Sequence, residues 1–101
     1  MKDRKARRTV QIGFGNSVLV DRIIAIFSVD TNPVKKMISD NKNIGLVVDL
    51  TRDKKTKSAI LMDNDYIILS PINHSTLVNR INREDTLMSK NVLDSLDEEE
   101  E

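Results

Sequence analysis

The sequence predicts a small α+β domain with a mostly antiparallel sheet and two short helices, in the order ββαβββα. Three observations lead to this fold class. Runs rich in β-branched residues are separated by turn-forming Gly, Asn and Asp, one proline-led segment has helical spacing, and a second such segment follows the last run. The 101 residues leave room for one small domain. We expect that domain at residues 9–83, after a basic arm at 1–8 and before an acidic, mobile tail at 84–101.

The first two strands are expected on either side of a turn that contains glycine. Residues 9–14 have the composition of a strand, and Gly15 and Asn16 offer the turn. Residues 18–28 form a longer extended run that is rich in β-branched side chains. Gly13 and Gly15 are expected to permit a tight bend or a close approach between backbones.

The rest of the fold follows from one proline-led helix and three further strands. Pro33 suits the first position of a helix, where its missing N–H costs nothing, and Thr31 or Asn32 can cap that helix. Gly45 marks its end. Strands are then predicted at residues 46–50, 56–62 and 66–70, and a second short helix at 73–81.

Two of the predicted strands have continuous apolar runs, at residues 23–27 and 66–69. A strand that is apolar on both faces needs cover on both faces. Two helices of about ten residues each can cover one face of such a sheet, and no other segment is expected to cover the second. The sequence therefore predicts a homo-oligomer in which strands pack between subunits.

Composition limits the class of protein. The chain has no cysteine, so disulfides and thiolate–metal sites are not expected, and we expect a cytoplasmic protein. No apolar run is long enough to span a membrane, and no signal peptide is expected.

The net charge is zero, but residues 1–8 carry five cations and one carboxylate, whereas residues 90–101 carry six carboxylates and one cation. Basic arms commonly bind nucleic acid, and acidic tails commonly modulate that contact.

Four cations within six residues lie between two apolar runs, where a turn must join two strands. They are Arg52, Lys54, Lys55 and Lys57. On a tight hairpin these side chains would form one concentrated positive surface, which suits the backbone of a polyanion. A solvated turn without a partner is the alternative, because turns attract lysine and aspartate anyway.

Arg22 interrupts an apolar strand run, so its guanidinium must reach water, a carboxylate or a phosphate. Pairing with Asp21, or with an acid on another strand, is one interpretation. The other is that Arg22 extends the positive surface of residues 52–57.

Catalytic, metal and nucleotide sites lack the residue patterns that they need. Gly13-Phe14-Gly15 lacks the third glycine of a dinucleotide-binding motif, where this chain has Val18. His74 is the single histidine and has no cysteine or carboxylate at metal-ligand spacing. We therefore expect no enzyme, no cofactor, no metal ion and no small-molecule substrate.

The few aromatic residues narrow the kind of nucleic acid. Phe14, Phe27 and Tyr66 all lie in apolar strand patterns, where core packing is the default. Proteins that bind single strands need exposed rings for base stacking. Duplex DNA, held through its phosphates, fits this chain better.

Several segments, in order and spacing, together resemble the RemA-like extracellular matrix regulatory proteins. They are IGFGN at residues 12–16, RIIAI at 22–26, Pro33 followed by Lys35 and Lys36, Val48-Asp49 before the basic segment, and DYIILS at 65–70. The resemblance runs from about residue 10 to residue 81. It implies a bacterial DNA-binding transcriptional regulator of biofilm matrix operons, which forms a ring-shaped homo-oligomer that presents basic loops to duplex DNA.

The resemblance also implies which residues contact DNA. The family's arginine after the glycine motif falls on Arg22, and its arginine-rich turn falls on Lys54, Lys55 and Lys57. Here the chain has lysines where arginines are usual and Asp53 where glycine is usual. Lysine keeps the charge and loses bidentate geometry, so phosphate attraction should survive while base readout weakens.

Two hypotheses follow. The first is a cytoplasmic, oligomeric regulator that binds duplex DNA through Arg22, Arg52, Lys54, Lys55 and Lys57. The second is a self-assembling interaction scaffold whose basic loops dock an acidic protein partner or the chain's own acidic tail.

Overall fold

The computed structural model describes residues 8–83, so all but the last residue of the predicted basic arm, and the whole acidic tail, lie outside the described residues. The α+β class with two helices is confirmed. The elements in chain order are β1 (Thr9–Gly13), β2 (Asn16–Leu19), a 3-10 turn (Val20–Arg22), β3 (Ile23–Ser28), α1 (Asn32–Asn43), β4 (Val47–Asp49), β5 (Ser58–Met62), β6 (Ile67–Ser70) and α2 (His74–Arg83).

Strands β1 and β2 form an antiparallel hairpin joined by a turn at residues 14–15. Gly13 at the end of β1 and the turn residues Phe14 and Gly15 have φ values of 112°, 53° and 79°. A Cβ atom on Gly13 would lie 3.1 Å from Cγ of Pro71. The glycines thus permit the tight bend that the sequence predicts, and Gly13 also allows the turn to approach Pro71 closely.

The prediction of one long extended run at residues 18–28 is wrong. The chain leaves β2 after Leu19, makes a 3-10 turn and enters β3, which belongs to a different sheet. Asp21 and Arg22 are both exposed in this turn. Their charges oppose burial in a continuous strand, so the chain turns where they occur.

The second sheet has four strands in the order β3-β5-β6-β4. Strand β5 is antiparallel to both of its neighbours, whereas β4 is parallel to β6. Because β6 lies between β4 and β5, the connection that carries residues 52–57 is a crossover loop. The prediction of a tight hairpin there is wrong. Each of the last three strands is also shorter than predicted by one or two residues.

Both helices occur near their predicted positions. Thr31 precedes α1 with an extended backbone, but its side chain makes no capping hydrogen bond. Pro33 lies in the first turn of α1, and Gly45, with a φ of 78°, follows its end. Neither α1 nor α2, within residues 8–83, is long and apolar enough to cross a membrane.

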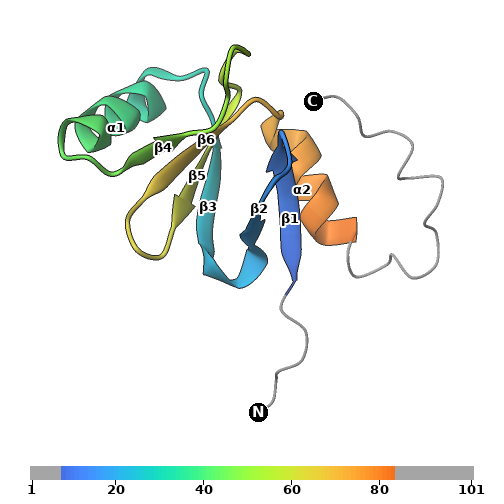
Figure 1. Cartoon of the computed structure of the whole chain (residues 1–101). Helices are drawn as coiled ribbons and strands as arrows, with labels where there is room; N and C mark the ends of the chain where they lie inside the picture. Colours follow the sequence, from blue (N-terminus) through green and yellow to red (C-terminus); the bar gives the residue numbers. More distant parts are fainter. Residues whose placement is uncertain (1–7, 84–101) are drawn as a thin grey trace.

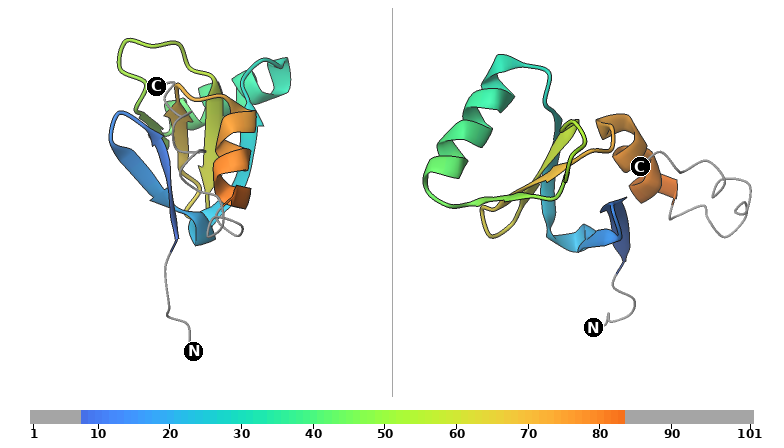
Figure 2. Two further views of the ribbon diagram at one scale, coloured as in Figure 1. Left: turned by 90° about the vertical axis from the view of Figure 1, so that its right-hand side faces the viewer. Right: turned by 45° about the horizontal axis from the view of Figure 1, so that its top comes forward.

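The chain itself covers both faces of the four-stranded sheet, as Figures 1 and 2 show: α1 lies on one side, and β1, β2 and α2 lie on the other. Alternate residues of β5 supply the two cores. Ile60 and Met62 join a core with Val10, Ile12, Val18, Ile72 and Leu77. Ala59 joins a second core with Ile67 and Leu69, against which Met37 and Ile38 of α1 pack.

The reasoning that no segment could cover the second face was therefore wrong, because the β1–β2 hairpin folds over it. Some apolar surface stays uncovered. Ile24 and Ile44 are 60% and 67% exposed, and Val48 and Tyr66 are each 36% exposed. A ring-like homo-oligomer remains a prediction, and these four exposed apolar side chains are the observation that favours it.

Candidate nucleic-acid interface

Hydrogen bonds fix the start of the basic loop, which we define as residues 52–57. Oδ1 of Asp49 accepts a hydrogen bond of 2.6 Å from Oγ1 of Thr51 and one of 3.0 Å from its backbone N–H. Both bonds favour the ionised carboxylate, the side-chain bond most, and with the positive charge of Lys42 they hold the pKa of Asp49 below its ordinary value. Thr51 is buried, and its carbonyl accepts a hydrogen bond of 2.9 Å from the N–H of Lys54.

The end of the loop is tied to two strands. The N–H of Lys57 donates to the carbonyl of Ser70 at 2.9 Å, and the Lys57 carbonyl accepts from the N–H of Val29 at 3.4 Å. The loop therefore has a fixed backbone at both ends.

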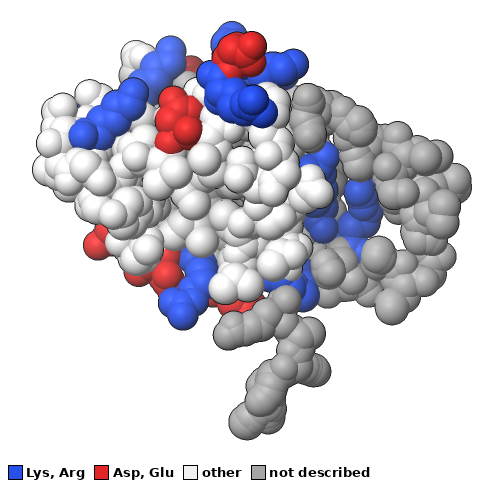
Figure 3. Space-filling view, in the orientation of Figure 1, with Lys and Arg blue, Asp and Glu red and all other residues white. Residues whose placement is uncertain are grey.

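The four cations of the basic loop, Arg52, Lys54, Lys55 and Lys57, are all exposed. Lys and Arg side chains gather over this end of the molecule, where the loop rises beyond the strands (Figure 3). A cluster of exposed like charges creates a positive potential that attracts polyanions. The structure thus brings these four predicted site residues together.

Arg52 makes a contact that the sequence does not predict. Its guanidinium carbon lies 4.8 Å from the centroid of the Phe14 ring, in cation–π geometry. Both residues have positive φ, 57° for Arg52 and 53° for Phe14. Phe14 is therefore a support for the basic loop and not the strand residue of a core, as had been expected. The sequence does contain a signal for this role, which is an aromatic residue placed between two glycines.

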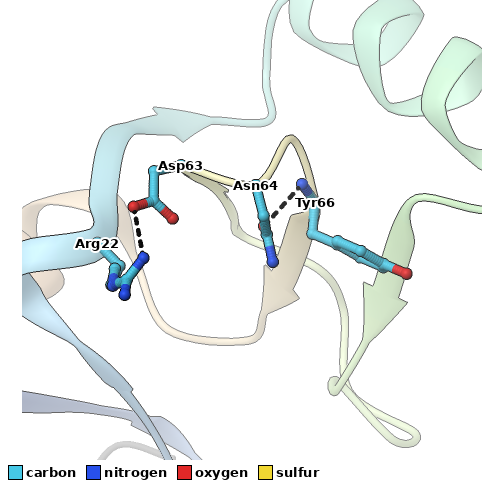
Figure 4. A network of polar contacts seen from close by, with 4 residues as sticks. All are labelled: Arg22, Asp63, Asn64 and Tyr66. Atoms are coloured by element: carbon cyan, nitrogen blue, oxygen red, sulfur yellow. Dashed lines mark hydrogen bonds and ion pairs between the residues drawn. The ribbon is translucent and has the colours of Figure 1, made fainter.

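Arg22 lies apart from these four cations. Its Nη1 is 3.0 Å from Oδ2 of Asp63, and the Arg22 side chain is 57% exposed (Figure 4). Asp63 follows the end of β5, whereas Lys57 precedes its start. With the five residues of β5 between them, at about 3.3 Å per residue, Lys57 and Asp63 are roughly 20 Å apart. Of the two interpretations of Arg22, the structure supports pairing with an acid on another segment, and that acid is Asp63.

Metal ligation finds no support in the part of the chain that the structure describes. There, no group of three or more His, Cys, Asp or Glu side chains is placed to hold a metal ion. His74, the single histidine of the sequence, begins α2. The arrangement is that of a cationic surface on an anchored loop.

Comparison with known proteins supplies the family. The family model RemA-like, described as extracellular matrix regulatory protein A-like, matches residues 9–81. Extracellular matrix regulatory protein A of Bacillus subtilis strain 168 is 34% identical over 83 residues, which are 82% of this chain and 93% of the relative.

Two further relatives carry the name "Putative regulatory protein". The one from Thermoanaerobacter sp. strain X514 is 36% identical over 94 residues, 93% of this chain and 94% of the relative. The one from Geobacillus kaustophilus strain HTA426 is 42% identical over 72 residues, 71% of this chain and 83% of the relative. These names are those of regulatory proteins and not of enzymes. The chain belongs to the RemA-like family of extracellular matrix regulatory protein A-like proteins.

Proposed function

We propose that this protein is an oligomeric transcriptional regulator that binds duplex DNA through the phosphate backbone. The observation that carries the proposal is the cluster of four exposed cations on a loop whose two ends are held by backbone hydrogen bonds. A loop that is already ordered loses little conformational entropy when it binds, so its charges act efficiently on a ligand. The regulatory names of the relatives support the same role.

The residue types favour backbone contact over base readout. Lys54, Lys55 and Lys57 are point charges, which attract phosphates without fixing an orientation. Arg52 can use its planar guanidinium for a bidentate contact, although its face is already directed at Phe14. We therefore expect DNA affinity that depends strongly on salt and weakly on sequence.

Assembly is the second part of the proposal. The exposed apolar side chains Ile24, Ile44, Val48 and Tyr66 are candidates for burial between copies. In an assembly, the basic loops of several copies act on one duplex, and Arg22 of one copy adds its charge from the other end of the sheet. If each engaged copy neutralises about three phosphates, a few copies give a slope of log affinity against log salt near −10.

The test is a gel-shift titration of random-sequence duplex at several salt concentrations. Lys55→Ala is expected to weaken binding similarly for unrelated sequences and to reduce the salt slope by about one for each engaged copy. Lys36→Ala is the matched control, because Lys36 is an exposed lysine on α1 that pairs with Asp40 of the same helix. Equal affinity of Lys55→Ala and wild type, with assembly intact, would refute the role of the loop.

A scaffold function is the second candidate, and one cavity favours it. It has a volume of about 490 Å3, and Leu19, Val48, Met62, Tyr66 and Ile68 supply an apolar lining. Apolar cavities on an exposed sheet suit protein contacts. A protein that assembles but shows no affinity for DNA in low salt would favour the scaffold over the regulator.

A further inference from the structure

A second, polar cavity lies beside the basic loop. Its volume is about 400 Å3, and three segments that are distant in sequence line it. One is the end of β3 with Asp30, one is the loop with Lys55 and Lys57, and one is the start of α2 with His74 and Ser75. The resemblance and the sequence patterns give the third segment no role in binding.

The lining has an excess of positive charge. Lys55 and Lys57 both line the cavity, and Asp30 is its one carboxylate. Oδ2 of Asp30 accepts a hydrogen bond of 3.3 Å from Oγ of Ser28. This bond occupies one acceptor position of the Asp30 carboxylate. The ammonium groups therefore dominate the field inside the cavity, and this field favours an anion.

Buried hydrogen bonds fix the segment that leads to His74 and Ser75. Oγ of Ser58 donates to the carbonyl of Ile72 at 2.8 Å, and the N–H of Ile72 donates to Oγ of Ser70 at 3.0 Å. Ser58 and Ser70 are both fully buried. These bonds hold the segment before His74 and Ser75 against the sheet, so the two donors at the start of α2 keep their place relative to the loop.

We propose that this cavity holds a backbone phosphate of the bound DNA, with Lys55 and Lys57 of the loop and His74 and Ser75 of α2 as its donors. Lysine ammoniums, hydroxyl groups and imidazole N–H groups are common donors to DNA phosphates. The inference rests on the proposed DNA-binding function and extends the interface from the loop to the start of α2.

A carboxylate introduced at Ser75 tests the cavity directly. Ser75→Glu places negative charge in the cavity, where it competes with the phosphate for the lysines. An acidic residue in the first turn of a helix is favourable for the helix, so the variant is expected to fold. Asn82→Glu is the matched control, because Asn82 is exposed near the other end of α2 and the change in charge is the same.

Fluorescence anisotropy with a random-sequence duplex measures the affinities of wild type, Lys55→Ala and both glutamate variants of the full chain. Ser75→Glu is expected to weaken binding on the order of tenfold and Asn82→Glu less than twofold. The double variant Lys55→Ala, Ser75→Glu is expected to lose less than the product of the two single effects, since both changes act on one phosphate.

The outcomes separate the two proposals. If Lys55→Ala weakens binding while Ser75→Glu behaves like Asn82→Glu, the cavity holds no phosphate and DNA binding by the loop stands. If wild type itself does not bind the duplex, the proposed function falls, and the cavity proposal falls with it.

Discussion

The guanidinium of Arg52 lies over the ring of Phe14, with 4.8 Å between the guanidinium carbon and the ring centroid. The two residues are in separate turns, one in the β1–β2 hairpin and one in the crossover between β4 and β5. This contact helps to fix the position of one turn relative to the other. It also restricts the side chain of Arg52.

Phe14→Leu is expected to lower DNA affinity by about two- to fivefold, because a cation–π contact at an exposed site is worth about 0.5–1 kcal/mol. Anisotropy titrations with a random duplex measure the effect. The same substitution in an Arg52→Ala background is the control and should change nothing further, since the cation is already absent. Equal losses in both backgrounds would show that Phe14 acts independently of Arg52.

Asp49 gives stability that depends on pH. Its pKa is lowered in the folded chain, so its ionised form stabilises the fold above the ordinary value of 3.8, and this contribution is lost as pH falls through the lowered pKa. Asp49→Asn keeps an acceptor for Thr51 but does not titrate. Urea unfolding between pH 7 and pH 2.5 should therefore show a smaller acid-dependent loss of stability for Asp49→Asn than for wild type. Identical pH profiles would contradict this role.

The two glycines of the β1–β2 turn should differ in their tolerance of alanine. Both have positive φ, but a Cβ atom on Gly13 meets Pro71 at 3.1 Å, whereas one on Gly15 meets nothing within 4 Å. Gly15→Ala is expected to cost about 1 kcal/mol of unfolding free energy from backbone strain alone, and Gly13→Ala about 2–3 kcal/mol. Thermal and urea unfolding measure both. Equal costs would mean that Pro71 moves aside freely.

Asp63→Asn tests whether the Arg22 guanidinium is available to DNA. The pair is exposed, so its loss should change stability by less than about 0.5 kcal/mol. If Arg22 contacts phosphates, removing its carboxylate partner should strengthen binding more than Asp65→Asn, which removes the same charge nearby from a residue not paired with Arg22. Gel shifts with equal affinity for the two variants would assign Arg22 to the ion pair alone.

Local signals predicted the helices and the hairpin turn well. Pro33 and Gly45 act within a few residues of the helix ends that they mark, and Gly13 and Gly15 act within their own turn. The charged pair Asp21-Arg22 is a local sign of the break at residues 20–22, but the β-branched residues on both sides of it favoured one continuous strand.

The parallel pairing of β4 with β6 and the contact between Arg52 and Phe14 were not predicted, and each joins segments far apart in the chain. For Arg22, an ion pair with an acid on another strand was one interpretation, but the sequence did not identify Asp63 as that acid. Strand order and register are set by packing across the whole domain, so composition identifies the strands but not their neighbours. For the same reason the four loop cations could be grouped from sequence, whereas the position of Arg22 could not.

Native mass spectrometry, with and without a random-sequence duplex, tests most directly the claim that assembled copies present the basic loop to DNA. For wild type in low salt we predict one species of several copies, whose mass increases by that of a duplex when DNA is added. For the variant with Lys54 and Lys55 replaced by alanine, we predict the same assembly without the added mass. A single-copy species that gains no duplex mass would contradict the account.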